Sequence, residues 1–380
     1  MSGAAPGEHI ATIGVGMLGY AFMGKAHANA YRTLPYMAWP PPLRPSLVAI
    51  AGRDADAVDE AGRRYGFASA VTDWRELIAD ERVELFDNSG PNGLHRDPTI
   101  AAAEAGKHVI CEKPLGRDAA ESHEIWQRVA ATGVKHMCGF NYRFVPAIRL
   151  AREMIAAGEL GEIRHFRARY LQSWGVDREL HSWRFDRSQA GSGALGDLGA
   201  HIVDLGRYLV GEVTAVAGIT RTFLADRRGH AVDVDDAFQA VVEFANGASG
   251  TLEASRLAIG RLNHLVLEVN GSRGSVAFDL ERLNELEVSS VESAQPGFQR
   301  ILVTEPQHPF MSWWWPPGHI IGWEHTFVHE LHHLLSAIAG DRPVGPHGAD
   351  FEDGYRAAAI CEAIERSAES DCHQPLEFAR

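Results

Sequence analysis

The sequence predicts an α/β protein in which a doubly wound parallel sheet precedes a second domain built on an antiparallel or mixed sheet. Two observations support this prediction. Up to about residue 145, strand-like and helix-like segments alternate, as in parallel sheets with helices on both faces. Beyond that point strand-like segments follow one another directly, which is typical of antiparallel pairing. We therefore expect one domain over residues 1–145 and a second over residues 146–380, whose C-terminal helix is free to pack back on the first.

The individual elements are assigned from apolar runs and helical periodicity. The expected strands of the first domain are 10–19, 47–52, 83–90, 107–114 and 134–144, and its expected helices are 22–34, 54–65, 97–106 and 118–131. The expected helices of the second domain are 146–157, 324–339 and 351–369. Its strand-like runs are 162–174, 213–223, 237–256 with a hairpin turn at Asn246-Gly247, 264–279 and 285–292.

The composition is that of an ordinary globular protein and narrows the function. Of the 380 residues, 45% are apolar and 23% are charged. A net charge of -14 without a basic run excludes nucleic acid and anionic membrane surfaces as expected partners. No apolar run reaches the roughly 18 residues of a membrane-spanning helix, and the N-terminus lacks the layout of a signal peptide. The cysteines are scattered, which favours reduced thiols and a cytoplasmic location. They are Cys111, Cys138, Cys361 and Cys372.

A glycine-rich turn after the first strand predicts a nucleotide site. The spacing G-x-G-x-x-G runs from Gly14 to Gly19, and a second register with alanine in its middle place runs from Gly19 to Gly24. We favour the second register, because it leaves room for a strand from Ile10 to Leu18 and starts a helix at its last glycine. Such a turn brings backbone N–H groups and a helix N-terminus to a pyrophosphate. A strand, turn and helix without a ligand is the alternative. The expected contacts are Gly19, Ala21, Phe22, Met23 and Gly24.

The end of the second strand bears on the choice of coenzyme. An acidic residue at this place binds the ribose 2′-hydroxyl of NAD. This chain has Gly52 there, followed by Arg53 and Asp54. Arg53 would pair with a 2′-phosphate, whereas Asp54 would reach the ribose. We therefore expect NAD or NADP, with a lean toward NADP.

Three residues form a candidate proton-transfer set. Lys113 follows a strand-like run in the tripeptide Glu112-Lys113-Pro114. Asp197 and His201 are four residues apart in GDLGAHIVDL, a spacing that aims both side chains at one face of a helix. Beside a nucleotide site, this set indicates hydride transfer to or from a nicotinamide. Taken without other context, a surface lysine and a solvated helical pair are the competing interpretations.

These motifs together resemble the glucose–fructose oxidoreductase / inositol dehydrogenase family. The likeness includes Lys25-Ala26-His27 after the glycine turn, PNGLH at 91–95, AGKHVICEKPLG at 105–116, NYRF at 141–144 and GDLGAHIVDL at 196–205. Within the family, YLQSW at 170–174, SWRFDRSQAGSGALGD at 182–197 and the early PYMAWPPP loop are most similar to levoglucosan-type sugar dehydrogenases.

The resemblance implies a Rossmann domain, a C-terminal α/β domain with a large open, mainly antiparallel sheet, and redox chemistry at a ring hydroxyl. The substrate is then a sugar, anhydrosugar, glycoside or cyclitol. The resemblance also implies a homodimer or homotetramer that associates through the open sheet face, since an open sheet must be covered.

The family's site residues map onto positions of this chain. The resemblance adds as cofactor contacts Ser89, Pro91, Asn92, His95, Glu112, Lys113, Trp183 and Arg184. It gives as substrate contacts Lys113, Asn141, Gln172, Trp174, Arg184, Asp197 and His201. The chain departs from the family at Ala21, at Gly90, where threonine is common, and at the missing acid after the second strand. These departures bear on coenzyme preference.

The expected mechanism assigns one role to each residue of the set. His201 is the general base, because an imidazole with a pKa of about 6.5 suits proton removal near neutral pH. Asp197 orients its ring, and Lys113 stabilises the developing alkoxide. An exchange of roles between Lys113 and His201 is the alternative. Two other functions compete with a dehydrogenase: a nicotinamide-dependent glycosidase that uses transient oxidation, and a non-catalytic sensor that binds dinucleotide.

Two further segments require an interpretation. His329-Glu330-Leu331-His332-His333 spells the zinc motif H-E-x-x-H, with Glu352 nineteen residues past its last histidine. The apolar side of the expected helix predicts that His329 and His333 point away from it, toward solvent or an interface, so we expect no metal site. Trp313-Trp314-Trp315 cannot all point inward, and stacking on a sugar, a subunit contact and a packed loop are the open interpretations.

Overall fold

The structure, a computed structural model, describes residues 10–379 and divides them into two compact units. The first unit holds the described residues up to Leu115, together with Glu121–Asn141 and Gly322–Gly354. The second holds Gly116–Ala120, Tyr142–Ile321 and the described residues from Tyr355 onward. The change from the first unit to the second after Asn141 thus falls four residues before the expected boundary at 145. The later segment Gly322–Gly354 returns to the first unit.

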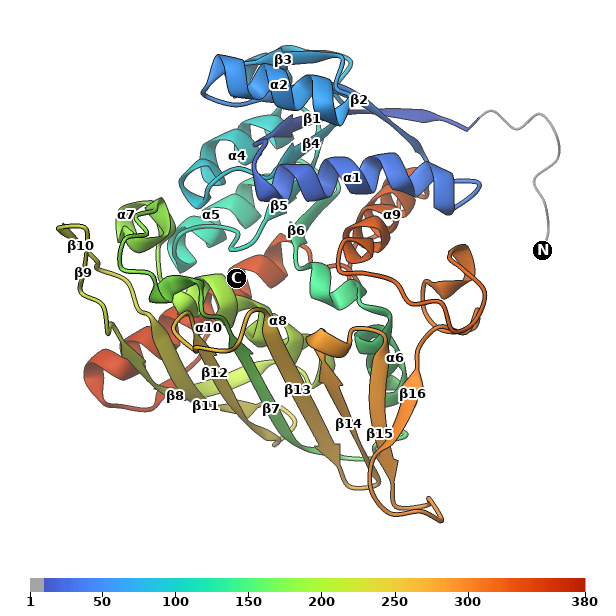
Figure 1. The fold of residues 1–380 in the computed structure, drawn as a ribbon, viewed down its shortest axis with the longest axis vertical. Coiled ribbons are helices and arrows are strands. Elements are labelled where there is room, and N and C mark those ends of the chain that lie inside the picture. The colour runs from blue at the N-terminus through green and yellow to red at the C-terminus, as the bar shows by residue number, and fades with distance from the viewer. Residues whose placement is uncertain (1–9, 380) are drawn as a thin grey trace. The chain divides into compact units, whose positions relative to one another are not determined.

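A six-stranded parallel sheet forms the centre of the first unit (Figure 1). The strand order β3-β2-β1-β4-β5-β6 reverses between β1 and β4, as in doubly wound nucleotide-binding folds. This confirms the predicted parallel sheet. The strands are β1 (Thr12–Leu18), β2 (Arg44–Ala51), β3 (Ser69–Val71), β4 (Leu85–Asn88), β5 (His108–Glu112) and β6 (His136–Gly139).

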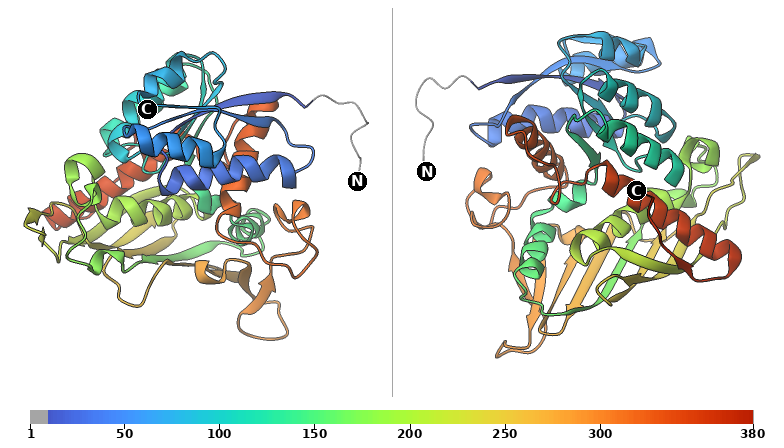
Figure 2. Two further views of the ribbon diagram at one scale, coloured as in Figure 1. Left: turned by 45° about the horizontal axis from the view of Figure 1, so that its top comes forward. Right: turned by 180° about the vertical axis from the view of Figure 1, so that it is seen from behind.

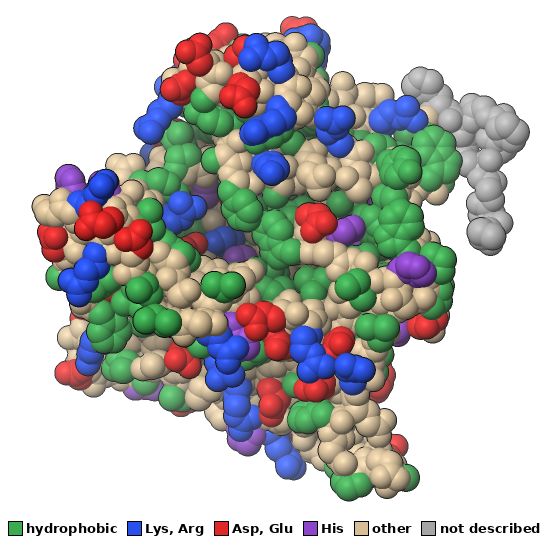
Figure 3. Space-filling view, viewed as in Figure 1, with side chains coloured by type: hydrophobic (Ala, Val, Ile, Leu, Met, Phe, Trp, Pro, Cys, Tyr) green, Lys and Arg blue, Asp and Glu red, His purple; other side chains and the backbone are tan. Residues whose placement is uncertain are grey.

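The helices of the first unit follow the strands in sequence. They are α1 (Phe22–Met37), α2 (Ala55–Tyr65), α3 (Trp74–Ala79), α4 (Arg96–Glu104), α5 (Ala119–Ala130) and α9 (His325–Ala339). Local chemistry sets the ends of α2: the Asp54 carboxylate accepts from the Ala57 N–H at 2.9 Å, and Gly66 ends the helix with a φ of 85°. The outer side of α2 is covered with acidic and basic side chains (Figure 3). Helix α9 packs on α1 and contacts β6, which brings the C-terminal segment to this sheet.

A nine-stranded mixed sheet forms the second unit, in the order β16-β15-β14-β13-β7-β12-β11-β8-β17. Only the β7–β12 pairing is parallel, so the expected mainly antiparallel sheet is confirmed. The strands are β7 (Ile163–Leu171), β8 (Val213–Arg221), β11 (Ala237–Phe244), β12 (Ser249–Ser255), β13 (His264–Gly271), β14 (Gly274–Asp279), β15 (Glu285–Ser290), β16 (Gln299–Leu302) and β17 (Gln374–Pro375), beside a small hairpin of β9 (Asp226–Arg227) and β10 (His230–Ala231).

The two faces of this large sheet differ in composition. The helices α6 (Pro146–Ala156) and α8 (Ala200–Leu209) pack on one face, which Figure 2 also shows from behind. Along β7, Phe166, Ala168 and Tyr170 are buried on that side, whereas Arg167 and Arg169 alternate to the other face. The remaining helices are α7 (Arg187–Ala190) and α10 (Phe351–Ser370). Among the described residues, no helix is both long and apolar enough to cross a bilayer.

Candidate functional site

The turn between β1 and α1 has the geometry of a nucleotide-binding turn. Gly19 has a φ of 104°, and a Cβ there would lie 2.6 Å from the carbonyl oxygen of Ser89. A Cβ on Gly24 would lie 2.2 Å from the carbonyl oxygen of Gly19, so glycine permits the first turn of α1 to approach the loop. The strand ends at Leu18, as the second register requires. The helix begins at Phe22, however, which places Gly24 inside its first turn rather than at its start.

The N-terminus of α1 is suited to an anion. Ala21 is the N-cap residue and its side chain accepts no hydrogen bond, and the first turn contains no acidic residue. The first N–H groups of a helix have no acceptor within the helix, and the helix dipole favours negative charge at this end. Together with the two tight glycine positions, this end of α1 fits the pyrophosphate of a dinucleotide.

The loop after β2 explains why no acidic residue stands at position 52. A Cβ on Gly52 would lie 2.1 Å from the ring of Tyr20, so this ring fills the place of a larger side chain. The Tyr65 hydroxyl donates to the carbonyl oxygen of Tyr20 at 2.9 Å and holds the loop. Asp54 is engaged as the N-cap of α2, and the side chain of Arg53 is exposed to solvent. Arg53 is thus accessible to a ligand, while Asp54 already accepts a backbone N–H.

The carboxyl ends of β4 and β5 carry the next group of expected residues. The Ser89 hydroxyl donates to Asp87 at 2.6 Å, and Asn92 begins a short helical turn beside the exposed Pro91. His95 is fully buried, with its ring nitrogens 2.8 Å from the Pro114 carbonyl oxygen and 3.0 Å from that of Gly90. Burial lowers the pKa of His95, although both carbonyl contacts act in the opposite direction. The His95 side chain therefore ties the Gly90 loop to the Pro114 loop.

The motif Glu112-Lys113-Pro114 lies directly after β5, on the same edge of the sheet as the glycine turn. Glu112 is buried, and its carboxylate accepts from the Lys113 N–H at 3.1 Å. The Lys113 residue is partly exposed to solvent. Asn141, expected to contact substrate, is buried in the first unit and donates to the Thr326 hydroxyl at 2.9 Å.

Asp197 and His201 lie in the second unit, on a helical segment of unusual form. Asp197 belongs to a π-helical turn, Leu195–Gly199, that leads into α8, where His201 is buried. Such wide turns are frequent at functional sites. The surrounding glycines allow close packing: a Cβ on Gly193 would lie 1.7 Å from the carbonyl oxygen of Asp235, and one on Gly199 would lie 2.6 Å from the ring of Phe238.

A buried arginine that the sequence did not single out holds Asp197. Arg256, only 1% exposed, donates to the Asp197 carboxylate at 3.2 Å and to the Arg184 carbonyl oxygen at 3.1 Å. Its guanidinium also lies over the ring of Trp174, 5.0 Å from the centroid. Three expected site residues thus share one buried cation.

Two tyrosine side chains lie beside His201. The rings of Tyr142 and Tyr170 lie 4.6 and 5.8 Å from its centroid, and their hydroxyls are 2.8 Å apart. The Tyr170 hydroxyl donates to Asn263 at 2.6 Å, and Gln172 donates to the same amide oxygen at 2.7 Å. Burial, with the Tyr142 hydroxyl beside it, raises the pKa of Tyr170 well above 10, so this hydroxyl stays protonated.

Sequence reasoning did not identify Tyr142, Tyr170, Asn263 or Arg256 as site residues. NYRF and YLQSW were visible as motifs and contain both tyrosines. No local pattern marked Asn263 or Arg256, which reach the site only through strand pairing. Trp183, expected from the resemblance to contact the cofactor, begins a short helical turn, and the Arg184 guanidinium lies 4.5 Å from the centroid of its ring.

The prediction for the H-E-x-x-H segment was partly wrong. His329 is fully buried rather than directed toward solvent or an interface, because α9 is packed on more than one side, against α1 and β6. The neighbouring Glu330 is fully buried as well. His333 is partly exposed and donates to the Val344 carbonyl oxygen at 2.7 Å. Within residues 10–379, the one group of three potential metal ligands is elsewhere, at His264, Asp279 and Glu281. There the Arg261 guanidinium already lies 3.4 Å from the imidazole.

Comparisons with known proteins agree with this geometry. Residues 13–140 match the family described as "Oxidoreductase family, NAD-binding Rossmann fold", and residues 148–277 match the "GFO/IDH/MocA C-terminal domain". Levoglucosan dehydrogenase from Pseudarthrobacter phenanthrenivorans is 42% identical over 94% of this chain and 96% of its own length. The chain belongs to the GFO/IDH/MocA oxidoreductase family. This confirms the resemblance seen in the motifs.

Other relatives place this oxidoreductase among NAD-binding dehydrogenases. A solved structure of levoglucosan dehydrogenase in complex with NADH has a TM-score of 0.94 at 42% identity, covering 97% of this chain and 100% of that one. An oxidoreductase domain protein from Kribbella flavida has a TM-score of 0.93 at 43% identity, with the same coverage. Inositol 2-dehydrogenase from Rhizobium meliloti is 27% identical over 94% of this chain and 97% of its own length.

Proposed function

We propose that this oxidoreductase is an NAD-dependent dehydrogenase of an anhydrosugar of the levoglucosan type. The observation that carries the proposal is the end-to-end likeness to levoglucosan dehydrogenase, including its complex with NADH. The uncapped N-terminus of α1 and its two tight glycine positions fit that coenzyme. When bound, the nicotinamide supplies a hydride acceptor at its C4.

The residues of the predicted set would handle the proton and the charge. His201 removes the hydroxyl proton, and the Asp197 carboxylate, held by Arg256, favours the charged form of that imidazole. Lys113 stabilises the developing alkoxide oxygen through its ammonium group. The other proposed cofactor and substrate contacts are those named from the sequence. Among them, Asn141 acts through its hydrogen bond to Thr326 of α9.

The polar side chains beside His201 favour a polyhydroxylated ring. Gln172, Tyr170 and Asn263 form one connected hydrogen-bond network whose members offer both donors and acceptors. A few such convergent polar groups on an otherwise aromatic wall are what fixes a small polar ligand in orientation. Tyr142 and Tyr170 supply the aromatic part of that wall.

The test is absorbance at 340 nm with purified protein, NAD or NADP, and levoglucosan beside inositols, monosaccharides and glycosides. We expect NAD reduction with levoglucosan. The exposed Arg53 is the residue expected to accept a 2′-phosphate, so the ratio of kcat/KM for the two coenzymes tests the earlier lean toward NADP. Glycoside cleavage without net coenzyme reduction would instead identify a glycosidase, and tight dinucleotide binding without turnover would identify a sensor.

Two variants test the assigned roles. Lys113→Ala and His201→Ala are each expected to lower kcat by roughly 10² to 10⁴. Lys135→Ala is the matched control, because Lys135 precedes β6 and pairs with Asp341 at 2.7 Å. Near wild-type kcat in both Lys113→Ala and His201→Ala would refute the proposed mechanism.

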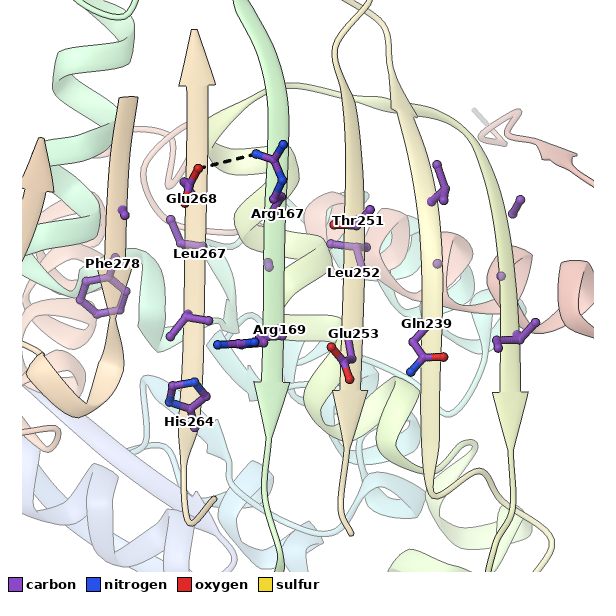
Figure 4. A pocket seen from close by; sticks show the side chains of 18 of the residues that line it. Arg167, Arg169, Gln239, Thr251, Leu252, Glu253, His264, Leu267, Glu268 and Phe278 are labelled. Atoms are coloured by element: carbon purple, nitrogen blue, oxygen red, sulfur yellow. Dashed lines mark ion pairs between the residues drawn. The ribbon is translucent and has the colours of Figure 1, made fainter. Parts of the chain in front are cut away.

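The proposal includes a second copy of the chain on the open face of the large sheet. This face has a shallow hollow of about 1000 Å³ lined by basic, acidic and apolar side chains (Figure 4). Arg167 and Glu268 pair across strands at 3.6 Å, and Val241 is 53% exposed there. Mixed charges with apolar residues suit a two-fold, self-complementary contact.

Sedimentation tests this association. A dimer or tetramer is expected, and Val241→Glu should shift it toward the monomer. Ile259→Glu is the control, since Ile259 is also an exposed apolar residue but lies outside the hollow. A monomeric wild-type protein would contradict this part of the proposal. A cytoplasmic location stays a prediction from the cysteine pattern.

A further inference from the structure

A buried histidine connects the glycine turn to the Glu112-Lys113-Pro114 loop. His27 lies on α1, five residues after Phe22, and is fully buried. Its Nδ1 is 2.8 Å from an Asp87 carboxylate oxygen at the end of β4. Its Nε2 is 3.1 Å from a Glu112 carboxylate oxygen at the end of β5. One side chain thus reaches three elements at the edge of the sheet where the coenzyme is expected.

The partners of His27 require it to carry two protons. An ionised carboxylate only accepts hydrogen bonds, and a neutral imidazole has a single N–H to donate. With a carboxylate at each ring nitrogen, both nitrogens must donate. Burial alone would lower the pKa of His27, but the charges and hydrogen bonds of Asp87 and Glu112 outweigh it and raise the pKa well above 6.5.

The groups around His27 complete this network. The Tyr31 hydroxyl, one turn along α1, donates to Asp87 at 3.0 Å, and the Ser89 hydroxyl donates to the same carboxylate at 2.6 Å. From α9, the Phe327 ring lies 5.4 Å from the imidazole, and the charge of Glu330 acts on Tyr31. The Asp87 carboxylate therefore accepts from three donors: His27, Tyr31 and Ser89. They fix the end of the network opposite to Lys113.

The other side of the network ends at the Lys113 backbone. The Glu112 oxygen that His27 does not contact accepts from the Lys113 N–H at 3.1 Å. A Cβ on Gly139 would lie 3.0 Å from the first oxygen of Glu112, so the neighbouring strand leaves the carboxylate little room to rotate. The orientation of Glu112 thus sets the direction in which the chain leaves β5.

We propose that His27 is a positioning residue for catalysis: it holds the Glu112 carboxylate, and this carboxylate holds the backbone of Lys113 in its reactive place. The inference rests on the proposed function, which assigns the reacting oxygen to Lys113. Without the His27 cation, two buried carboxylates lie close together without a counter-charge. Glu112 then turns or takes up a proton, and the Lys113 N–H loses its acceptor.

The experiment combines kinetics with amide hydrogen exchange in the full chain. His27→Gln is expected to lower kcat roughly a hundredfold, the effect of a misplacement of about 1 Å, with little change in the KM for NAD. In a Lys113→Ala background the same substitution should have almost no further effect on kcat, since there is no ammonium left to position. Exchange at the Lys113 amide should become faster in His27→Gln.

Matched variants separate positioning from folding. His136→Gln also replaces a partly buried histidine of the first unit, one that accepts from the Phe351 N–H and pairs across the strands with Val109 rather than with Glu112. It should retain wild-type kcat and slow Lys113 exchange. If His27→Gln does not fold, Glu112→Gln removes the same charge pair at equal side-chain size and should show the same non-additive loss.

Each outcome decides the inference. Wild-type kcat in a folded His27→Gln protein would overturn it, as would a loss that multiplies fully with that of Lys113→Ala. If Lys113→Ala itself keeps wild-type kcat, the role that the proposed function assigns to Lys113 fails instead. The exchange measurement at Lys113 still decides then whether His27 holds this loop.

Discussion

Replacing Arg256 by methionine should uncouple Asp197 from its support while keeping the length of the side chain. Arg256 follows β12 and is buried, with only 1% of its surface exposed. The variant removes the donor to Asp197 at 3.2 Å, the donor to the Arg184 carbonyl oxygen at 3.1 Å and the cation above Trp174. Methionine fills most of the same volume with a flexible apolar chain.

The expected loss of stability follows from these contacts. Removing one partner of a buried ion pair typically costs about 3–5 kcal/mol, and a cation–π contact contributes about 0.5–2 kcal/mol. Two features reduce the total. The Asp197 side chain is 26% exposed, so water partly replaces its partner. The Nε of Arg256 is buried without a hydrogen bond among the described residues, and methionine removes this unsatisfied group. We expect the free energy of unfolding to fall by about 2–4 kcal/mol.

The loss of activity should exceed what unfolding explains. Asp197 without Arg256 no longer orients the proposed base, and kcat should fall by roughly 10 to 100-fold at a temperature where the variant is folded. Urea unfolding and steady-state kinetics on one preparation measure both effects.

Arg227→Met is the matched control. Arg227 is also buried, lies 4.0 Å from the Phe185 ring and donates to the carbonyl oxygens of Gly175 and Asp177, but has no contact with Asp197. It should lose stability and keep most of its kcat. An Arg256→Met protein with wild-type kcat and unfolding midpoint would refute the reasoning, and so would an equal loss of kcat in Arg227→Met.

Three further predictions concern the first unit. Gly19→Ala should weaken NADH binding at least tenfold in a fluorescence titration, because the new Cβ meets the Ser89 carbonyl oxygen at 2.6 Å; Gly133→Ala, also at positive φ but with nothing within 4 Å, should bind normally. Burial, with the charge of Lys135, lowers the pKa of His136 to about 4, so the unfolded chain binds a proton that the folded one refuses. Stability should therefore drop by roughly 2–3 kcal/mol as pH falls from about 6.5 to 4, and His136→Gln should flatten this slope in urea unfolding. The raised pKa of His27 has the opposite sign: its contribution is complete below about pH 6.5 and is lost as pH rises through the folded-state pKa, so wild type should lose more stability than His27→Gln on going to alkaline pH.

Local sequence patterns predicted most of the helices and strands but missed short ones. The alternation of strands and helices and the Asn246-Gly247 hairpin are present in the structure, where β11 and β12 pair around a Gly247 with a φ of 85°. The strand β3 and the helix α3 were not predicted, because three and six residues are too few for a periodic pattern to show.

Contacts across the chain explain the wrong expectation for His329. The apolar stripe of one helix describes one buried side only. Here α9 packs against both α1 and β6, so residues off the stripe are buried as well. The absence of a larger side chain at Gly52 has the same kind of cause, since the ring of Tyr20, from another loop, occupies that space.

The sequence by itself determined the features that depend on neighbours along the chain: the glycine turn, the caps of α2, the Glu112-Lys113-Pro114 loop and the helical spacing of Asp197 and His201. These follow from backbone sterics and residue periodicity within a few positions. Only the tertiary structure decided which charges are paired. His27 meets Asp87 and Glu112 across 60 and 85 residues, and Arg256 meets Asp197 across 59. Such pairs depend on strand order and on the face that each residue occupies, and no local pattern encodes either.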